Sequence, residues 1–137
     1  MSGLVLTLDQ LRARYAWDVA AKARRDSRNF ENYRNLAKGA PALIMGNGLM
    51  ASLAFWASRT GTAQHAAKQL GEDLRGWLNQ RKVLKTLDFQ GAMQGFMAME
   101  SSRYMEATDE ALAMLRWLRQ FGAVWLCGHR NRVAASA

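Results

Sequence analysis

The 137-residue chain lacks most of the side chains that build catalytic or metal centres. It has one cysteine, Cys127, and two histidines, His65 and His129, which stand apart from one another. A single thiol forms no internal disulfide, and this sparse use of cysteine fits a reducing cytoplasm. Neither an HExxH motif nor a pair of cysteines occurs, so the spacing of zinc ligands is missing. We therefore expect no metal and no cofactor.

Motifs for nucleotide binding and for covalent catalysis are missing as well. Residues 46–50, GNGLM, lack the lysine and Ser/Thr of a phosphate-binding loop. Adjacent acids such as Glu72 and Asp73 diverge by about 100° on a helix and do not face one substrate. Cys127 and His129 have no third group in view that would orient them as nucleophile and base. These absences argue against an enzyme and against a small-molecule substrate.

Acidic residues are scarce relative to basic ones. The chain holds 19 Lys and Arg against 11 Asp and Glu, a net charge of +8. A polyanion is the first partner class to test, nucleic acid ahead of acidic lipid, although charge that only aids solubility is the alternative. The N-terminal residues lack the pattern of a secretory signal, which predicts a cytoplasmic protein. The length predicts one helical domain over residues 1–137.

Strand patterns are nearly absent, so we predict an all-α fold. The expected architecture is a compact bundle of about five to six helices around a central apolar helix. That helix is assigned to residues 40–59, which carry no charge before Arg59. Its apolar residues do not alternate, which disfavours a hairpin at the Asn-Gly pair, and its polar residues and glycines disfavour a membrane span.

Within the central run, Pro41 is expected in a first helical turn or at a kink. Asn47 is expected to be a buried polar group that needs hydrogen-bond partners. Leu49, Leu53 and Trp56 recur at helical spacing and are predicted to share a buried face.

Local signals predict where the other helices begin. Thr7 and Gln10 form a capping box at the start of the first helix. Asn29 is a candidate cap for a second segment, and Asp88 or Thr86 for a short helix near residue 89. A helix from about Ala63 to Arg81 and a long last helix from Ser101 or Ser102 are predicted from their apolar stripes. Beyond Leu126 the sequence loses its periodicity and is expected to fray or to become ordered on binding.

The first predicted helix carries the best basic face in the sequence. At about 100° per residue, Arg14, Lys22, Arg25 and Arg28 fall within an arc of about 120° beside the apolar stripe. Only Asp18 interrupts them. A charged face exposed to solvent is the ordinary explanation, and contact with a polyanion is the functional one.

Three patches of sequence carry a resemblance to a known family. The first is Leu8, Asp9, Gln10, Arg12, Ala13, Tyr15 and Ala16; the central one is Pro41, Asn47, Gly48, Leu49, Leu53, Ala54 and Phe55; the last runs from Tyr104 to Phe121. Together they resemble the small helical subunit of type III-B (Cmr) CRISPR effector complexes. Ala40 and Met50 depart from the family pattern, which often has leucine and glycine at these positions.

The resemblance implies a role in a cytoplasmic antiviral ribonucleoprotein. Small subunits of this kind form a filament of copies beside the subunits that bear the crRNA, help to hold the target RNA, and cleave nothing. The implied partners are other Cmr subunits, copies of the same chain, and crRNA or target RNA, without a membrane. By this resemblance, the residues that contact RNA phosphates are Arg14, Lys22, Arg25 and Arg28, with Arg34, Lys38 and Arg59 as further candidates because they flank the central run.

Two further expectations complete the interpretation. No aromatic platform that would stack single-stranded bases is evident in the sequence, so specificity is expected to reside in the guide. The alternative function is a structural protein–protein assembly module without nucleic-acid contact, in which exposed methionines and tryptophans anchor the interfaces.

Overall fold

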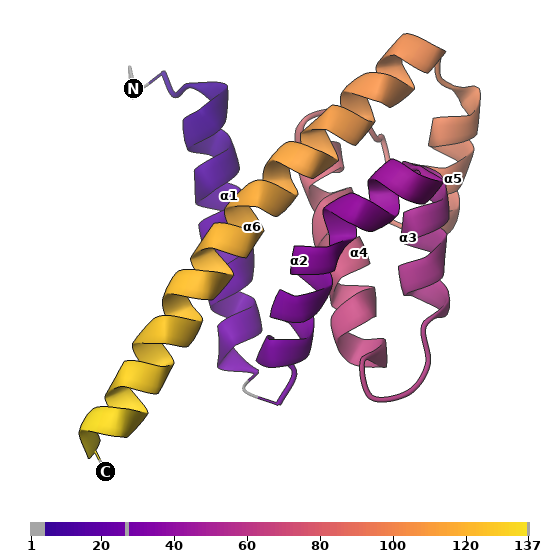
Figure 1. Ribbon diagram of the computed structural model, residues 1–137. Coiled ribbons are helices and arrows are strands. Elements are labelled where there is room, and N and C mark those ends of the chain that lie inside the picture. The colour runs from indigo at the N-terminus through magenta and orange to yellow at the C-terminus, as the bar shows by residue number, and fades with distance from the viewer. Residues whose placement is uncertain (1–4, 27, 137) are drawn as a thin grey trace.

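The computed structural model describes residues 5–26 and 28–136, with side chains described as far as Trp125. The six helices in order are α1 (Leu8–Arg25), α2 (Phe30–Asn47), α3 (Leu49–Ser58), α4 (Gln64–Gln80), α5 (Phe89–Ala98) and α6 (Ser101–Ser136). Within those ranges the chain forms no strand, and the prediction of an all-α fold is confirmed. The long helix α6 crosses α1 and α2, and α3 and α5 lie on the side away from α1 (Figure 1).

The helices share one hydrophobic core. Its largest members, Trp56 from α3 and Trp77 from α4, are 1% and 0% exposed. The apolar stripe that predicted a helix from about Ala63 to Arg81 forms the buried face of α4, where Ala66, Leu70, Leu74, Trp77 and Leu78 are all buried. In the part of the chain that the structure covers, each helix is too short or too polar to cross a bilayer.

The capping box predicted at the start of α1 is present. The Thr7 hydroxyl accepts a hydrogen bond from the Gln10 amide at 3.1 Å, and the Gln10 side chain accepts one from the Thr7 amide at 2.8 Å. Two orphan donors of the first turn are thereby satisfied. Asp88 caps α5 in a similar way, by accepting from the Gly91 amide at 2.9 Å.

Asn29 precedes α2, but its side chain does not cap the helix. Its amide donates instead to Asp26 at 2.8 Å, so the predicted capping role is wrong. The Asp26 carboxylate, three residues earlier in the chain, thus binds the Asn29 side chain that was expected to bond to the helix backbone.

The prediction of one helix over residues 40–59 is wrong, because Gly48 separates α2 from α3. Gly48 has φ 90° and ψ 163°, a conformation that is open essentially only to glycine. The new N-terminus that this break creates has partners. The Met50 amide donates to the Tyr104 hydroxyl at 3.0 Å, and the Ser52 hydroxyl donates to the Gly48 carbonyl at 2.8 Å.

Two other expectations for the central run are corrected. Pro41 lies inside α2, so a place in a first turn is wrong, and the alternative of a kink at this residue stays a prediction. Asn47 is exposed, because it ends α2 outside the face that carries Tyr33, Ala37 and Ile44 into the core. The predicted buried face of Leu49, Leu53 and Trp56 is confirmed.

The backbone of α6 remains helical through residues that were expected to fray. The Tyr104 hydroxyl accepts a hydrogen bond from the Met50 amide of α3. Ala111, Leu115 and Leu118, from the apolar stripe of this helix, are buried. Cys127 and His129 lie outside the residues whose side chains the structure describes.

Candidate nucleic-acid interface

The predicted basic face of α1 lies at the surface. Ala16 and Ala20 are the fully buried positions of this helix, and Arg14, Lys22 and Arg25 project away from them into solvent. Arg28 lies beyond the end of α1, in the turn before α2, so its predicted place on the helix face is wrong, but its side chain is also exposed. All four cations predicted to contact a polyanion are therefore accessible.

The three further candidates lie on or after other helices. Lys38 is exposed on α2. Arg34 is partly buried where α2 meets α6, and a Cβ placed on Gly122 would come within 3.1 Å of its Cγ. Arg59 follows the last residue of α3, and its guanidinium lies 5.5 Å from the centre of the Phe55 ring.

A buried carboxylate lies behind the basic face. Asp73 of α4 accepts hydrogen bonds from the Tyr33 hydroxyl at 2.6 Å and from the Gln69 amide at 2.9 Å. The Tyr15 hydroxyl donates to the Asp73 backbone carbonyl at 2.7 Å. Burial raises the pKa of Asp73 above its ordinary value, although the hydrogen bonds from Tyr33 and Gln69 and the charge of Lys22 lower it. Interactions from three helices thus meet at a residue whose role the sequence did not reveal.

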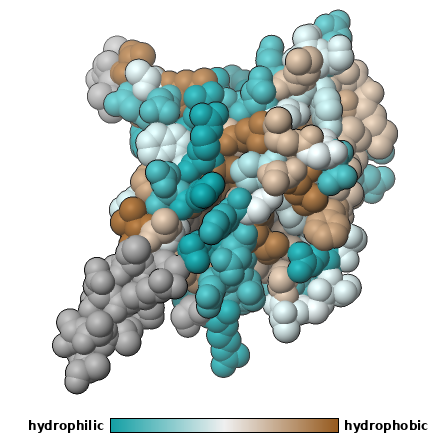
Figure 2. Space-filling model, in the orientation of Figure 1, coloured by the Kyte–Doolittle hydropathy of each residue, from teal (hydrophilic) through white to brown (hydrophobic). Residues whose placement is uncertain are grey.

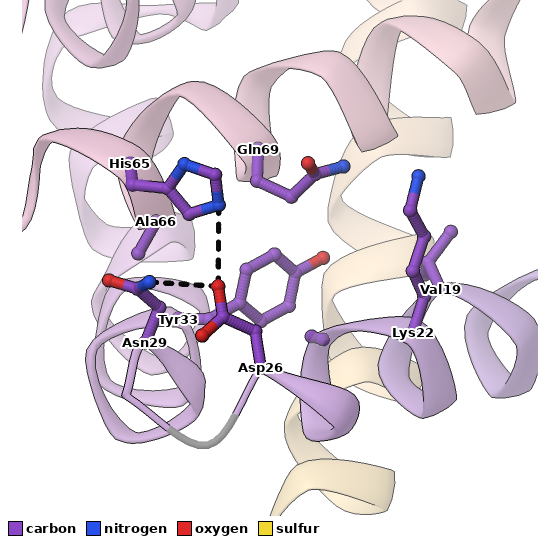
Figure 3. Close-up of a pocket in the computed structure, with 9 residues that line it drawn as sticks. Val19, Lys22, Asp26, Asn29, Tyr33, His65, Ala66 and Gln69 are labelled. Carbon is purple, nitrogen blue, oxygen red and sulfur yellow. Dashed lines mark hydrogen bonds and ion pairs between the residues drawn. The ribbon is translucent and has the colours of Figure 1, made fainter.

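A cavity of about 270 Å³ opens beside this cluster, between α1, α2 and α4. Lys22 lies on one side of it, and Asp26, Asn29 and His65 lie on the other (Figure 3). The His65 ring nitrogen is 3.5 Å from the Asp26 carboxylate, and both side chains are substantially exposed. Lys22 therefore belongs both to the basic face and to the rim of this cavity.

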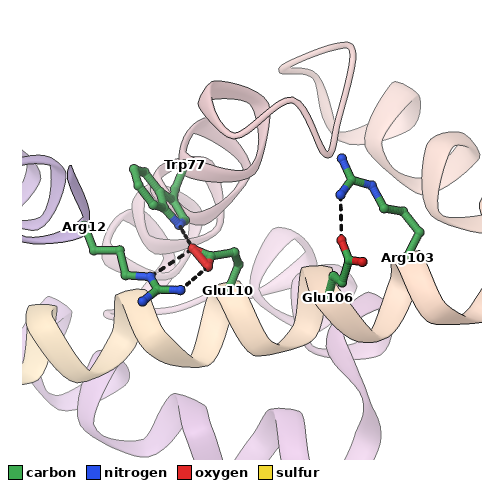
Figure 4. Close-up of polar contacts among 5 residues, drawn as sticks. All are labelled: Arg12, Trp77, Arg103, Glu106 and Glu110. Atoms are coloured by element: carbon green, nitrogen blue, oxygen red, sulfur yellow. Dashed lines mark hydrogen bonds and ion pairs between the residues drawn. The ribbon is translucent and has the colours of Figure 1, made fainter. Parts of the chain in front are cut away.

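Arg12 forms an ion pair, so its charge is matched and does not add to the basic surface (Figure 4). Its guanidinium donates to Glu110 of α6 at 3.0 and 2.5 Å, and the Trp77 indole donates to the same carboxylate at 3.3 Å. Burial raises the pKa of Glu110, but the hydrogen bonds and charge of Arg12 outweigh it and hold that pKa below its ordinary value. The partners of Glu110 thus lie on α1 and α4, far from it in the sequence.

Aromatic side chains of α1 and α6 meet at the surface, a feature that the sequence interpretation missed. We call Trp17, Trp117, Phe121 and Trp125 the aromatic seam. Trp17 is 49% exposed, and the other three are partly exposed. The spacing of Trp117, Phe121 and Trp125, one helical turn apart, is the sequence signal that points to this row. Aromatic rings therefore gather at the surface, although no stacking platform was evident in the sequence.

The described residues offer no comparable cluster for metal binding. No group of three or more His, Cys, Asp or Glu side chains among them is arranged to hold an ion. The fold and the site define a class: a small, basic, all-α protein whose surface presents cations and aromatic rings.

Comparisons with known proteins identify the family within this class. Residues 8–124 match the family model of the CRISPR-associated protein Cas_Cmr5. A curated relative, the CRISPR system Cmr subunit Cmr5 of Thermus thermophilus, is 30% identical over 115 residues, which cover 84% of this chain and 92% of the relative. The crystal structure of a CRISPR-associated Cmr5 family protein from the same organism superposes with a TM-score of 0.70 at 28% identity, covering 87% of this chain and 97% of the other.

The chain belongs to the Cmr5 family, and it is the small subunit of a type III-B (Cmr) CRISPR complex. The resemblance seen in the sequence is confirmed.

Proposed function

We propose that this subunit is non-catalytic and helps to hold the target RNA of its complex. The observation that carries this proposal is the exposed basic face of α1, with Arg14, Lys22 and Arg25 free of ion pairs among the described residues. Lys and Arg at a surface attract phosphates without reading sequence. Guide pairing, in this proposal, supplies the specificity.

The proposal includes the remaining assignments made from the sequence. The chain acts as one cytoplasmic domain, associates with other Cmr subunits, and lines up with copies of itself in a filament beside the crRNA. The residues proposed to contact RNA are Arg14, Lys22, Arg25 and Arg28, with Arg34, Lys38 and Arg59 as secondary contacts.

The salt dependence of RNA binding by the full chain tests the phosphate contacts. The test variant combines Arg14→Gln, Arg25→Gln and Arg28→Gln. Each contact with a single strand contributes about 0.7 to the slope of log affinity against log salt, so losing three should reduce the slope by about 2. Fluorescence anisotropy of a labelled RNA, measured between low and moderate salt, gives both slopes.

A control variant loses the same charge elsewhere on the surface. It combines Lys68→Gln, Lys82→Gln and Lys85→Gln, all at exposed positions outside α1 and α2. We expect this control to keep a slope near that of the natural protein. Equal slopes for both variants would show that net charge, and not the face of α1, attracts the RNA.

A second candidate function, an assembly module without RNA contact, is favoured by a different observation. Met45, Met97 and Met105 are 75%, 71% and 65% exposed. Hydrophobic residues gather over the side of the molecule that carries α3 and α5 (Figure 2). Exposed methionines suit adaptable protein interfaces. Binding through such a surface should change little with salt, which separates it from phosphate contact.

A further inference from the structure

We propose that the aromatic seam stacks unpaired bases of the RNA that the basic face holds. This inference rests on the proposed function and extends it from phosphates to bases. Aromatic rings combined with a positively charged groove are the means by which proteins bind single strands without sequence preference.

The rings of the seam form a connected row across two helices. Trp17 of α1 meets Phe121 of α6 edge to face, with ring centres 5.2 Å apart, and lies 4.6 Å from Trp125. Trp117 continues the row, 5.4 Å from Phe121. Because each ring supports the next, the row is held in place before any ligand arrives.

Solvent exposure distinguishes this row from the tryptophans of the core. Half of the Trp17 surface is open to water, whereas Trp56 and Trp77 are almost fully enclosed. Exposure of a large aromatic surface to water is unfavourable, and a base stacked on that surface would remove part of this cost. Trp17 is thus the position where a base gains most from the contact.

A groove of about 340 Å³ extends the seam between the first half of α1 and α6. Trp117 and Arg116 contribute to its lining, together with Arg12, whose charge is matched by Glu110. This volume is near the lower end of the range for ligand pockets, and it exceeds by far the space that a water molecule needs. The groove therefore offers room for a flat ring beside an indole.

The charges along the seam favour RNA over an ordinary protein partner. The Arg24 guanidinium lies 5.6 Å from the centre of the Trp125 ring, Arg116 lines the groove with Trp117, and Arg14 is exposed on α1. Asp9 is the acidic side chain that lines the groove without a basic partner among the described ion pairs. A ligand with both negative charge and flat apolar rings matches this combination.

Two RNA oligomers of equal length test the inference on the full chain. One carries bases and the other is abasic, so both present the same phosphates. Each base that stacks on an aromatic ring adds to the affinity. We therefore expect the natural protein to bind the base-bearing oligomer about tenfold more tightly than the abasic one. Either Trp17→Leu or Trp117→Leu should reduce that preference and leave affinity for the abasic oligomer unchanged.

Phe55→Leu is the matched control. Phe55 is 47% exposed and has an arginine over its ring, but it lies on α3, away from the seam. This variant should keep the preference for bases. Equal binding of both oligomers by the natural protein would overturn the stacking proposal and leave the phosphate contacts standing. Failure to bind either oligomer would overturn both proposals.

Discussion

At the scale of single residues, the structure depends on polar groups that meet from distant parts of the chain. Tyr33 and Asp73 are 40 residues apart, and Arg12 and Glu110 are 98 apart. Buried polar groups require partners because an unsatisfied one costs about 1–3 kcal/mol. The tyrosines suit this role, since burial raises the pKa of both Tyr15 and Tyr33 and keeps their hydroxyls protonated as donors.

Glu110→Gln tests the ion pair that joins α1 to α6. Removing the carboxylate leaves Arg12, which is only 23% exposed, without its charged partner. We expect the free energy of unfolding at pH 7 to fall by about 1.5–3 kcal/mol, the range for hydrogen bonds to charged groups. Denaturation in urea measures this change.

The same pair makes stability depend on pH. The pKa of Glu110 in the folded state lies below the ordinary value of 4.5, so its contribution is present above that value and is lost as the pH falls through the folded pKa. The difference in the free energy of unfolding between the natural protein and Glu110→Gln should therefore become smaller in acid. Glu106→Gln is the control, because the Arg103–Glu106 pair is largely exposed and such pairs contribute little. A gap of constant size at all pH values would contradict the assignment.

These residue-scale contacts mark the limit of what the sequence predicted about the site. Exposure of Arg14, Lys22 and Arg25 follows from helix periodicity, which is a local property. The aromatic seam and the partners of Glu110 depend on how α1 and α6 pack together, and periodicity within one helix does not determine this.

At the scale of helices, the local signals succeeded where they acted alone. The capping box at Thr7 and the apolar stripe of α4 each specify a structure within a few residues. The break at Gly48 was missed because Ala, Leu and Met on both sides favour helix, and propensity does not register a single residue with positive φ. The hydroxyl of Tyr104, from the last helix, stabilises that break.

Substituting two neighbouring glycines tests this account of the break. Gly48→Ala forces a side chain into a conformation that costs about 1–3 kcal/mol. Gly46→Ala, two residues earlier, lies in regular helix with nothing within 4 Å of the added Cβ. It should stabilise the protein by about 0.5–1 kcal/mol, the difference in helix propensity. The melting temperature should therefore fall for Gly48→Ala and rise for Gly46→Ala. Equal shifts for the two variants would show that Gly48 does not define the boundary between α2 and α3.

At the scale of the whole molecule, the net charge and the family membership support the same proposed function. The net charge of +8 is displayed in part on α1, and the family is that of the Cmr5 subunit of a CRISPR complex. Assembly and RNA contact are expected to use different surfaces, since the exposed methionines at positions 97 and 105 lie on α5 and α6 and the exposed arginines at positions 14 and 25 lie on α1.

The most direct test of the central claim compares complexes purified on the tagged full-length chain. One carries the natural sequence, and the other combines Arg14→Gln, Arg25→Gln and Arg28→Gln. We predict that both recover the other Cmr subunits and guide RNA equally, and that the variant retains severalfold less target RNA at moderate salt, because phosphate contacts have been lost. Equal retention of target RNA by the two complexes would contradict the claim that the basic face of this subunit holds the target.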